Sequence, residues 1–161
     1  MDKDIRNRIT SELITLIEKG NAHVSFDEAV SGLPADLRTV TPHGLPYNIW
    51  QLLEHIRITQ WDIVEFCLSS QHESPKWPEG YWPEEYPEKV DDLTWEASVN
   101  QIREDRSRFF DLLKDPEKNL LEAFAYGDGQ NLVREALLIA DHTSYHTGEI
   151  LVLRRLLNTW N

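Results

Sequence analysis

The stretch NIWQLLEHIRITQWDIVEFCL, residues 48–68, constrains the fold more than any other part of the chain. It contains neither proline nor glycine, and apolar side chains recur at positions 49, 53, 56, 63 and 67. This spacing follows the 3.6-residue period of an α-helix with one buried face. Pro42, Gly44 and Pro46 precede the run and predict that the helix begins just after them. The remaining elements must therefore pack around one long amphipathic helix.

Three further segments have the same helical period. Residues 4–19, about 94–114 and about 130–157 each place their apolar side chains on one side of a helix. Gly20-Asn21 and Asp115-Pro116 predict the ends of two of them. Neither strand alternation nor an internal repeat is found. Four long amphipathic helices in 161 residues predict an all-α fold, a four-helix bundle, with residues 1–161 forming a single domain.

Two connections between these helices are unusually long. Residues 22–45 are longer than an ordinary bundle loop, which favours a crossover over simple up-and-down threading. Within them, Ser25 and Glu28 form a capping-box pattern ahead of Ala29, which predicts a short helix. Residues 71–91 are rich in proline and aromatic residues and predict an ordered loop. Two roles stay open for its aromatic side chains, a lid over a substrate or a cap on the bundle, and these residues are Trp77, Tyr81, Trp82 and Tyr86.

The charge balance excludes several classes of partner. Asp and Glu outnumber Lys and Arg by 28 to 16, which gives a net charge of −12. Such a chain repels phosphate backbones and anionic membrane surfaces, so we expect no nucleic-acid and no membrane partner. The single cysteine, Cys67, cannot form an internal disulfide, and its position on a core-facing stripe predicts a buried, inert thiol. The chain starts without a signal-peptide pattern, and we expect a cytoplasmic protein.

The segment DHTSYHTGEI, residues 141–150, places two histidines inside the last predicted helix. His142, His146 and Glu149 share one helix face, and that face also carries the apolar side chains predicted to form the core. A buried imidazole must satisfy two ring nitrogens, and a shared cation satisfies one nitrogen of each histidine. The spacing alone is a weak motif, and ordinary packing remains the alternative.

His55 is the best third ligand. His23, His43 and His72 fall in predicted loops, whereas His55 lies within the helix of residues 48–68. It sits at the edge of the apolar stripe, where it would face an opening between helices. Three imidazoles leave coordination positions for water or substrate, which is typical of catalytic rather than structural metal sites. Taken by itself, without the pair on the last helix, His55 is better explained as a partly exposed histidine.

The segments LLEHI, DHTSYHTGEI and TPHGLPYNIWQ, together with the chain length, resemble the DinB-like (DinB/YfiT-like) family of metalloenzymes. The resemblance covers nearly the whole chain and implies a bundle of up-down-down-up order. It also implies that His55, His142 and His146 hold a divalent metal ion. The family often has glutamine where this chain has Glu149. Some relatives are transferases or isomerases that use a low-molecular-weight thiol, and the resemblance also favours a homodimer.

These observations predict a metal-dependent enzyme that acts on a small molecule by thiol transfer or hydrolysis, with zinc or nickel as the ion. Its catalytic residues stay unassigned: Glu149 could accept a proton or simply bond an imidazole, and Tyr145 could reach the rim of the site or pack on a neighbouring helix. The alternative is a non-catalytic, stress-related helical dimer that binds a metal or ligand. Trp50 and Trp61 predict either a homodimer contact or cover by the first connection, which contains Phe26 and Leu37.

Overall fold

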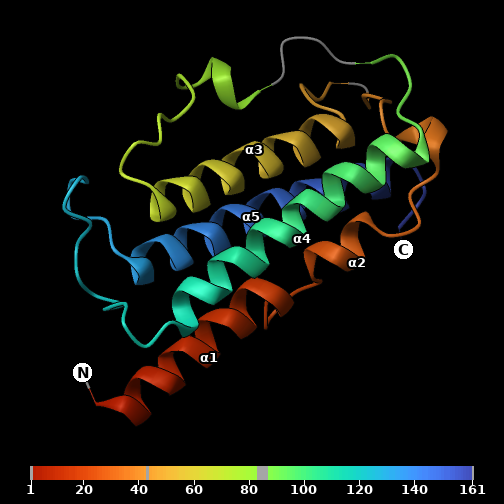
Figure 1. The fold of residues 1–161 in the computed structure, drawn as a ribbon. Helices are drawn as coiled ribbons and strands as arrows, with labels where there is room; N and C mark the ends of the chain where they lie inside the picture. Colours follow the sequence, from red (N-terminus) through yellow and green to blue (C-terminus); the bar gives the residue numbers. More distant parts are fainter. Residues whose placement is uncertain (1, 43, 83–86, 161) are drawn as a thin grey trace.

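The computed structural model describes residues 2–42, 44–82 and 87–160, and within these ranges the regular structure is entirely helical (Figure 1). The four long helices are α1 (Lys3–Lys19), α3 (Ile49–Leu68), α4 (Asp92–Lys114) and α5 (Leu132–Leu156). A short helix, α2 (Phe26–Val30), and two 3₁₀ turns, η1 (Ala35–Leu37) and η2 (Glu79–Tyr81), lie in the connections. The prediction of an all-α fold built on four long helices is confirmed.

Local capping interactions explain where several helices begin and end. Helix α1 ends at Gly20, which adopts a left-handed conformation with φ of 66°. Helix α2 begins after Ser25, whose hydroxyl accepts a bond from the Glu28 backbone N–H, while the Glu28 carboxylate accepts one from the Ser25 backbone N–H. The short helix predicted within residues 22–45 is therefore confirmed. A second capping box, formed by Asn48 and Gln51, starts α3.

The long helices surround a shared apolar core. Helices α3 and α1 each pack against both α4 and α5, and α2 packs against α5. In Figure 1, α3 and α4 run in one direction while α1 and α5 run in the other. Residues Leu52, Ile56 and Ile102 are fully buried toward one end of the core, and Phe109 and Leu113 toward the other. The core therefore extends along the length of the bundle.

The connection between α3 and α4 decides what covers the middle of α3. Because these two helices run in the same direction, the chain must return along the bundle between them. The described residues 69–82 and 87–91 belong to this return segment (Figure 1). The length of residues 22–45 had instead predicted that the crossover is the first connection, and that prediction is wrong. Within the return segment, η2 lies against α3. Through Tyr81 the segment contacts α3 at His55 and at Asp62, two turns apart.

The two tryptophans of α3 differ in how far the chain covers them. Trp50 is only 5% exposed, lies 6.3 Å from the Trp95 ring and belongs to the same buried cluster as Phe26. Its backbone N–H donates to the carbonyl of Arg38 in the first connection. Trp61 is half-buried and meets the His72 ring edge-on. Trp50 thus offers no surface to a second subunit. For this residue the second alternative, cover by the first connection, is the one that the structure has.

Candidate metal centre

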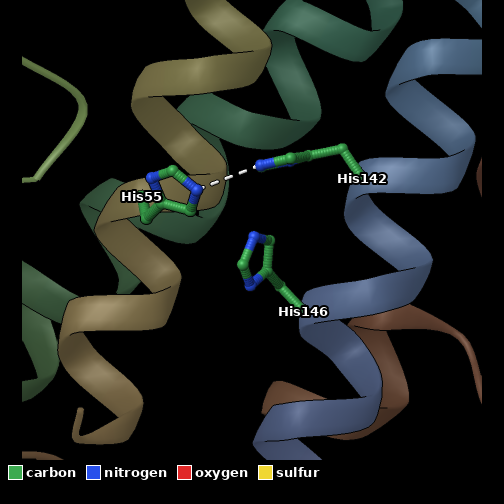
Figure 2. Close-up of side chains that lie close together, drawn as sticks. All are labelled: His55, His142 and His146. Atoms are coloured by element: carbon green, nitrogen blue, oxygen red, sulfur yellow. Dashed lines mark hydrogen bonds between the residues drawn. The ribbon is translucent and has the colours of Figure 1, made fainter. Parts of the chain in front are cut away.

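Three histidines from two neighbouring helices converge in the middle of the bundle. His55 projects from α3, and His142 and His146 project from successive turns of α5 toward it (Figure 2). One ring nitrogen from each of the three lies within 4.8 Å of the others, and the Nε2 atoms of His55 and His142 are 3.0 Å apart. The residues that the sequence singled out as ligands are therefore brought together by the fold.

The site is buried more deeply than the helical phase of His55 predicted. His55 is 3% exposed and His146 7%, while His142 is half-buried. The opening expected in front of His55 is filled by Trp82 from the return segment, whose ring stacks on the imidazole at a centroid distance of 3.9 Å. The centre is thus closed on the α3 side by an aromatic ring that the phase of α3 alone could not place.

Hydrogen bonds fix the orientation of two of the three imidazoles. The Nδ1 atom of His55 donates to the carbonyl oxygen of Tyr81 at 2.9 Å, and the Nδ1 atom of His146 lies 2.6 Å from a carboxylate oxygen of Glu149. With the proton held on Nδ1, each ring turns the lone pair of Nε2 toward the shared space between α3 and α5. Metal-binding histidines are oriented by this kind of bond from the outer ring nitrogen. The donor set therefore fits a cation.

The environment also favours the neutral form of two of these imidazoles, those of His55 and His142. Burial, reinforced by the neighbouring rings of His146 and His55, lowers the pKa of His142 to about 3. Burial likewise lowers the pKa of His55, although the hydrogen bond to the Tyr81 carbonyl acts in the opposite direction. Neutral imidazole is the form that binds a metal ion. At neutral pH these imidazoles are therefore in the form that can bind a metal ion.

A buried carboxylate anchors the return segment beside the site. Asp62 lies two turns after His55 on the same side of α3. One of its carboxylate oxygens accepts a bond from the Tyr81 hydroxyl at 2.7 Å, and the other lies 2.7 Å from His72 Nε2. Tyr81 is thereby held by its side chain while its carbonyl orients His55. Sequence reasoning missed this group, although an acidic residue on the inner side of α3, seven positions from a histidine, was a signal for it.

The aromatic loop divides into parts that reach the site and parts that do not. Tyr81 and Trp82 contact His55, and Tyr47, just before α3, also stacks on Trp82 at 4.8 Å. Trp77 is 70% exposed and meets only the edge of the Tyr81 ring among the aromatic residues described. Tyr86 and His43 lie outside the described residues. One face of the loop thus covers the metal centre, as a lid or a cap would.

The remaining candidates from the sequence have simpler surroundings. Glu149 makes the imidazole bond considered as one of its two roles. Tyr145 is exposed, and its ring lies edge-to-face with the His146 ring at a centroid distance of 4.9 Å. Cys67 is buried, and burial raises the pKa of its thiol, so this residue is not a nucleophile.

Comparison with known families agrees with this architecture. The family model described as the DinB superfamily matches residues 22–150 of the chain. This range contains α2 to α5 up to Ile150 and all three histidines, so the chain belongs to the DinB superfamily. No curated protein and no solved structure matched it.

Proposed function

We propose that the chain binds one divalent metal ion, zinc or nickel, through His55, His142 and His146, and that it uses the ion in thiol transfer or hydrolysis on a small molecule. The observation that carries this proposal is the convergence of three imidazoles, two of which already bond an oxygen atom through Nδ1. A bundle with this much buried core does not need a metal to fold, which favours a functional over a structural role.

When bound, the ion supplies Lewis-acid chemistry, which activates a thiol or water as a nucleophile near neutral pH. The surrounding residues orient the ligands and control the access of water. Trp82 covers His55, so water and substrate approach from the α5 side. Glu149 uses Oε2 to hold His146, and its side chain is 32% exposed. Its second oxygen therefore lies at the edge of the site, where it can accept a proton from the attacking group.

The negative net charge of the chain favours a small-molecule substrate over a polyanionic partner. The net charge of −12 disfavours nucleic acid and anionic membrane surfaces as partners. Among residues 2–42, 44–82 and 87–160, none of the helices combines the length and the apolar character that a membrane span needs. We keep the cytoplasm as the proposed compartment and a homodimer as the proposed assembly, and light scattering at micromolar concentration measures the mass.

Metal content and turnover test the proposal separately. Protein loaded with zinc or nickel and then desalted should retain about one ion per chain, and His142→Ala should lose it. His23→Ala, at a histidine near the end of α1, is the matched control and should keep it. If the parent and His142→Ala retain equal amounts of metal, the proposed metal site is wrong.

Turnover then separates an enzyme from a binding protein. The panel combines low-molecular-weight thiols with epoxides and activated chlorides, and includes ester substrates. We expect turnover by the metal-loaded parent on one of these classes and none by His146→Ala. Retained metal with identical background rates for both proteins on every class would favour the non-catalytic, stress-related binding protein.

A further inference from the structure

A groove of about 510 Å³ adjoins the metal centre on the α5 side. It lies between the chain segment that leads into α3 and the outer face of α5. We call it the apolar groove, and the lining residues that matter here are Leu45, Tyr47, Tyr145, Gly148, Glu149 and Val152. Its volume falls within the range of small-molecule sites.

Several residues that line the apolar groove also contact the histidines or the ring that covers them. Glu149 holds His146 through a 2.6 Å hydrogen bond, and the Tyr145 ring meets His146 edge-on at 4.9 Å. On the opposite wall, Tyr47 stacks on Trp82, which in turn stacks on His55. A molecule in the groove therefore lies against residues that touch the ligands or their cover.

The lining specifies the chemistry of an occupant. Most of it is aliphatic or aromatic, and among the described lining residues Glu149 alone carries a charge. Tyr145 and Val152 remain largely exposed, although both are apolar side chains on the same face of α5. Such a surface stabilises an apolar group through burial. The carboxylate at the inner end disfavours an anionic group next to it.

Gly148 lines the apolar groove and has no side chain to fill it. It lies inside the 25-residue helix α5, where glycine weakens the helix relative to alanine. A Cβ added at Gly148 would meet no described atom within 4 Å, so packing inside the chain does not require a glycine. What its missing side chain does provide is space, two residues after His146 and next to Glu149.

We propose that the apolar groove receives the non-reacting apolar arm, aliphatic or aromatic, of a neutral or cationic small-molecule substrate whose reacting group lies at the three histidines. This inference rests on the proposed metal-dependent function and adds the substrate class. The arm lies along Gly148 between Tyr47 and Tyr145. A positive charge near the reacting end would face Glu149.

The test uses a series of hydroxamates, which chelate a metal ion through two oxygens and carry alkyl tails of increasing length. Calorimetry with zinc- or nickel-loaded protein compares acetohydroxamate, butanohydroxamate and hexanohydroxamate. We expect each added methylene to tighten binding by up to about fourfold, from the free energy of burying a CH₂ group. Gly148→Leu should remove this gain while leaving the metal content and acetohydroxamate binding within about twofold of the parent.

Gly148→Ala is the graded control, because a methyl group fills little of the groove. It should retain most of the chain-length gain. A gain that is absent in the parent, or that is equally large in Gly148→Leu, overturns the inference even if the metal site is real.

A metal-free measurement separates the groove from the proposed function. Saturation-transfer NMR on metal-free protein reports whether the tail of n-hexylammonium contacts the chain. Tail contact in the parent and its loss in Gly148→Leu support the groove even if no metal binds, and no contact in the parent overturns it. A parent dimer that Gly148→Leu converts to a monomer would assign the groove to a second copy of the chain and would also overturn the inference.

Discussion

The indole ring of Trp82 lies flat on the imidazole of His55, with ring centroids 3.9 Å apart and planes inclined by 4°. The same histidine donates its Nδ1 proton to the carbonyl oxygen of Tyr81, the preceding residue. Two consecutive residues of the return segment therefore fix both the tilt and the rotation of one imidazole. The return segment thus shapes the histidine cluster although it supplies none of the three histidines.

Replacing Trp82 should weaken metal binding without removing a ligand. Trp82→Ala exposes His55 to water and frees the ring to rotate, so we expect the metal affinity to fall by about 10- to 100-fold, as for other groups that support a ligand. Competition with a chromogenic chelator measures the affinity. Trp77→Ala, in the same loop but 70% exposed, is the matched control and should bind as the parent does. Equal affinities of the two variants would show that the stack does not support the site.

Asp62 should matter for both stability and metal affinity. Asp62→Asn leaves the Tyr81 hydroxyl and His72 competing for one oxygen, so we expect the free energy of unfolding in urea to fall by about 1–3 kcal/mol. The metal affinity should fall as well, because the carbonyl that orients His55 is no longer anchored. Tyr81→Phe removes the hydroxyl that Asp62 holds but keeps the His72 contact, so we expect a smaller loss of stability and a comparable loss of metal affinity. If the metal affinity of Asp62→Asn were unchanged, the bond between Asp62 and Tyr81 would not support the metal site.

The sequence predicted the parts of this protein that are encoded locally. The helical period located α1, α3, α4 and α5. The four-residue spacing of His142 and His146 placed the two histidines on one helix face. Period and spacing can be read from the sequence because each depends on a single helix. The role of Tyr81 could not be predicted in this way, since it acts through a backbone carbonyl that every residue carries. The cover of His55 by Trp82 depends on the path of residues 69–91, which local periodicity does not specify.

Gly148 gives a test of the description of α5 that does not depend on any ligand. Because an added Cβ meets no described atom within 4 Å, Gly148→Ala should raise the free energy of unfolding by about 0.5–1 kcal/mol, the usual difference between the two residues in a helix interior. Gly20→Ala is the opposite case. Its φ is 66° and its Cβ would lie 2.5 Å from His23 Cε1, so this variant should be destabilised. Thermal unfolding of both variants, with opposite shifts expected, checks the prediction.

The buried histidines should make the metal-free protein sensitive to mild acid. In the folded chain the pKa of His142 is about 3, whereas in the unfolded chain it is close to its ordinary value of about 6.5. Both states carry a neutral imidazole above pH 6.5. As the pH falls from 6.5 toward 3, the unfolded chain binds the proton first, so the free energy of unfolding decreases through this window. His55, whose pKa is also lowered, acts in the same direction.

The expected contribution of His142 is a slope of up to about 1.4 kcal/mol per pH unit below pH 6.5. Urea unfolding in the presence of a chelator, at pH 7, 6, 5 and 4, measures the total pH dependence for the parent and for His142→Gln. Other titrating groups contribute to both proteins, so the difference between the two slopes isolates this imidazole. The parent should lose more stability than His142→Gln between pH 7 and pH 4. Parallel curves would mean that His142 is protonated as easily in the folded chain as in the unfolded one, which is incompatible with its burial beside two other imidazoles.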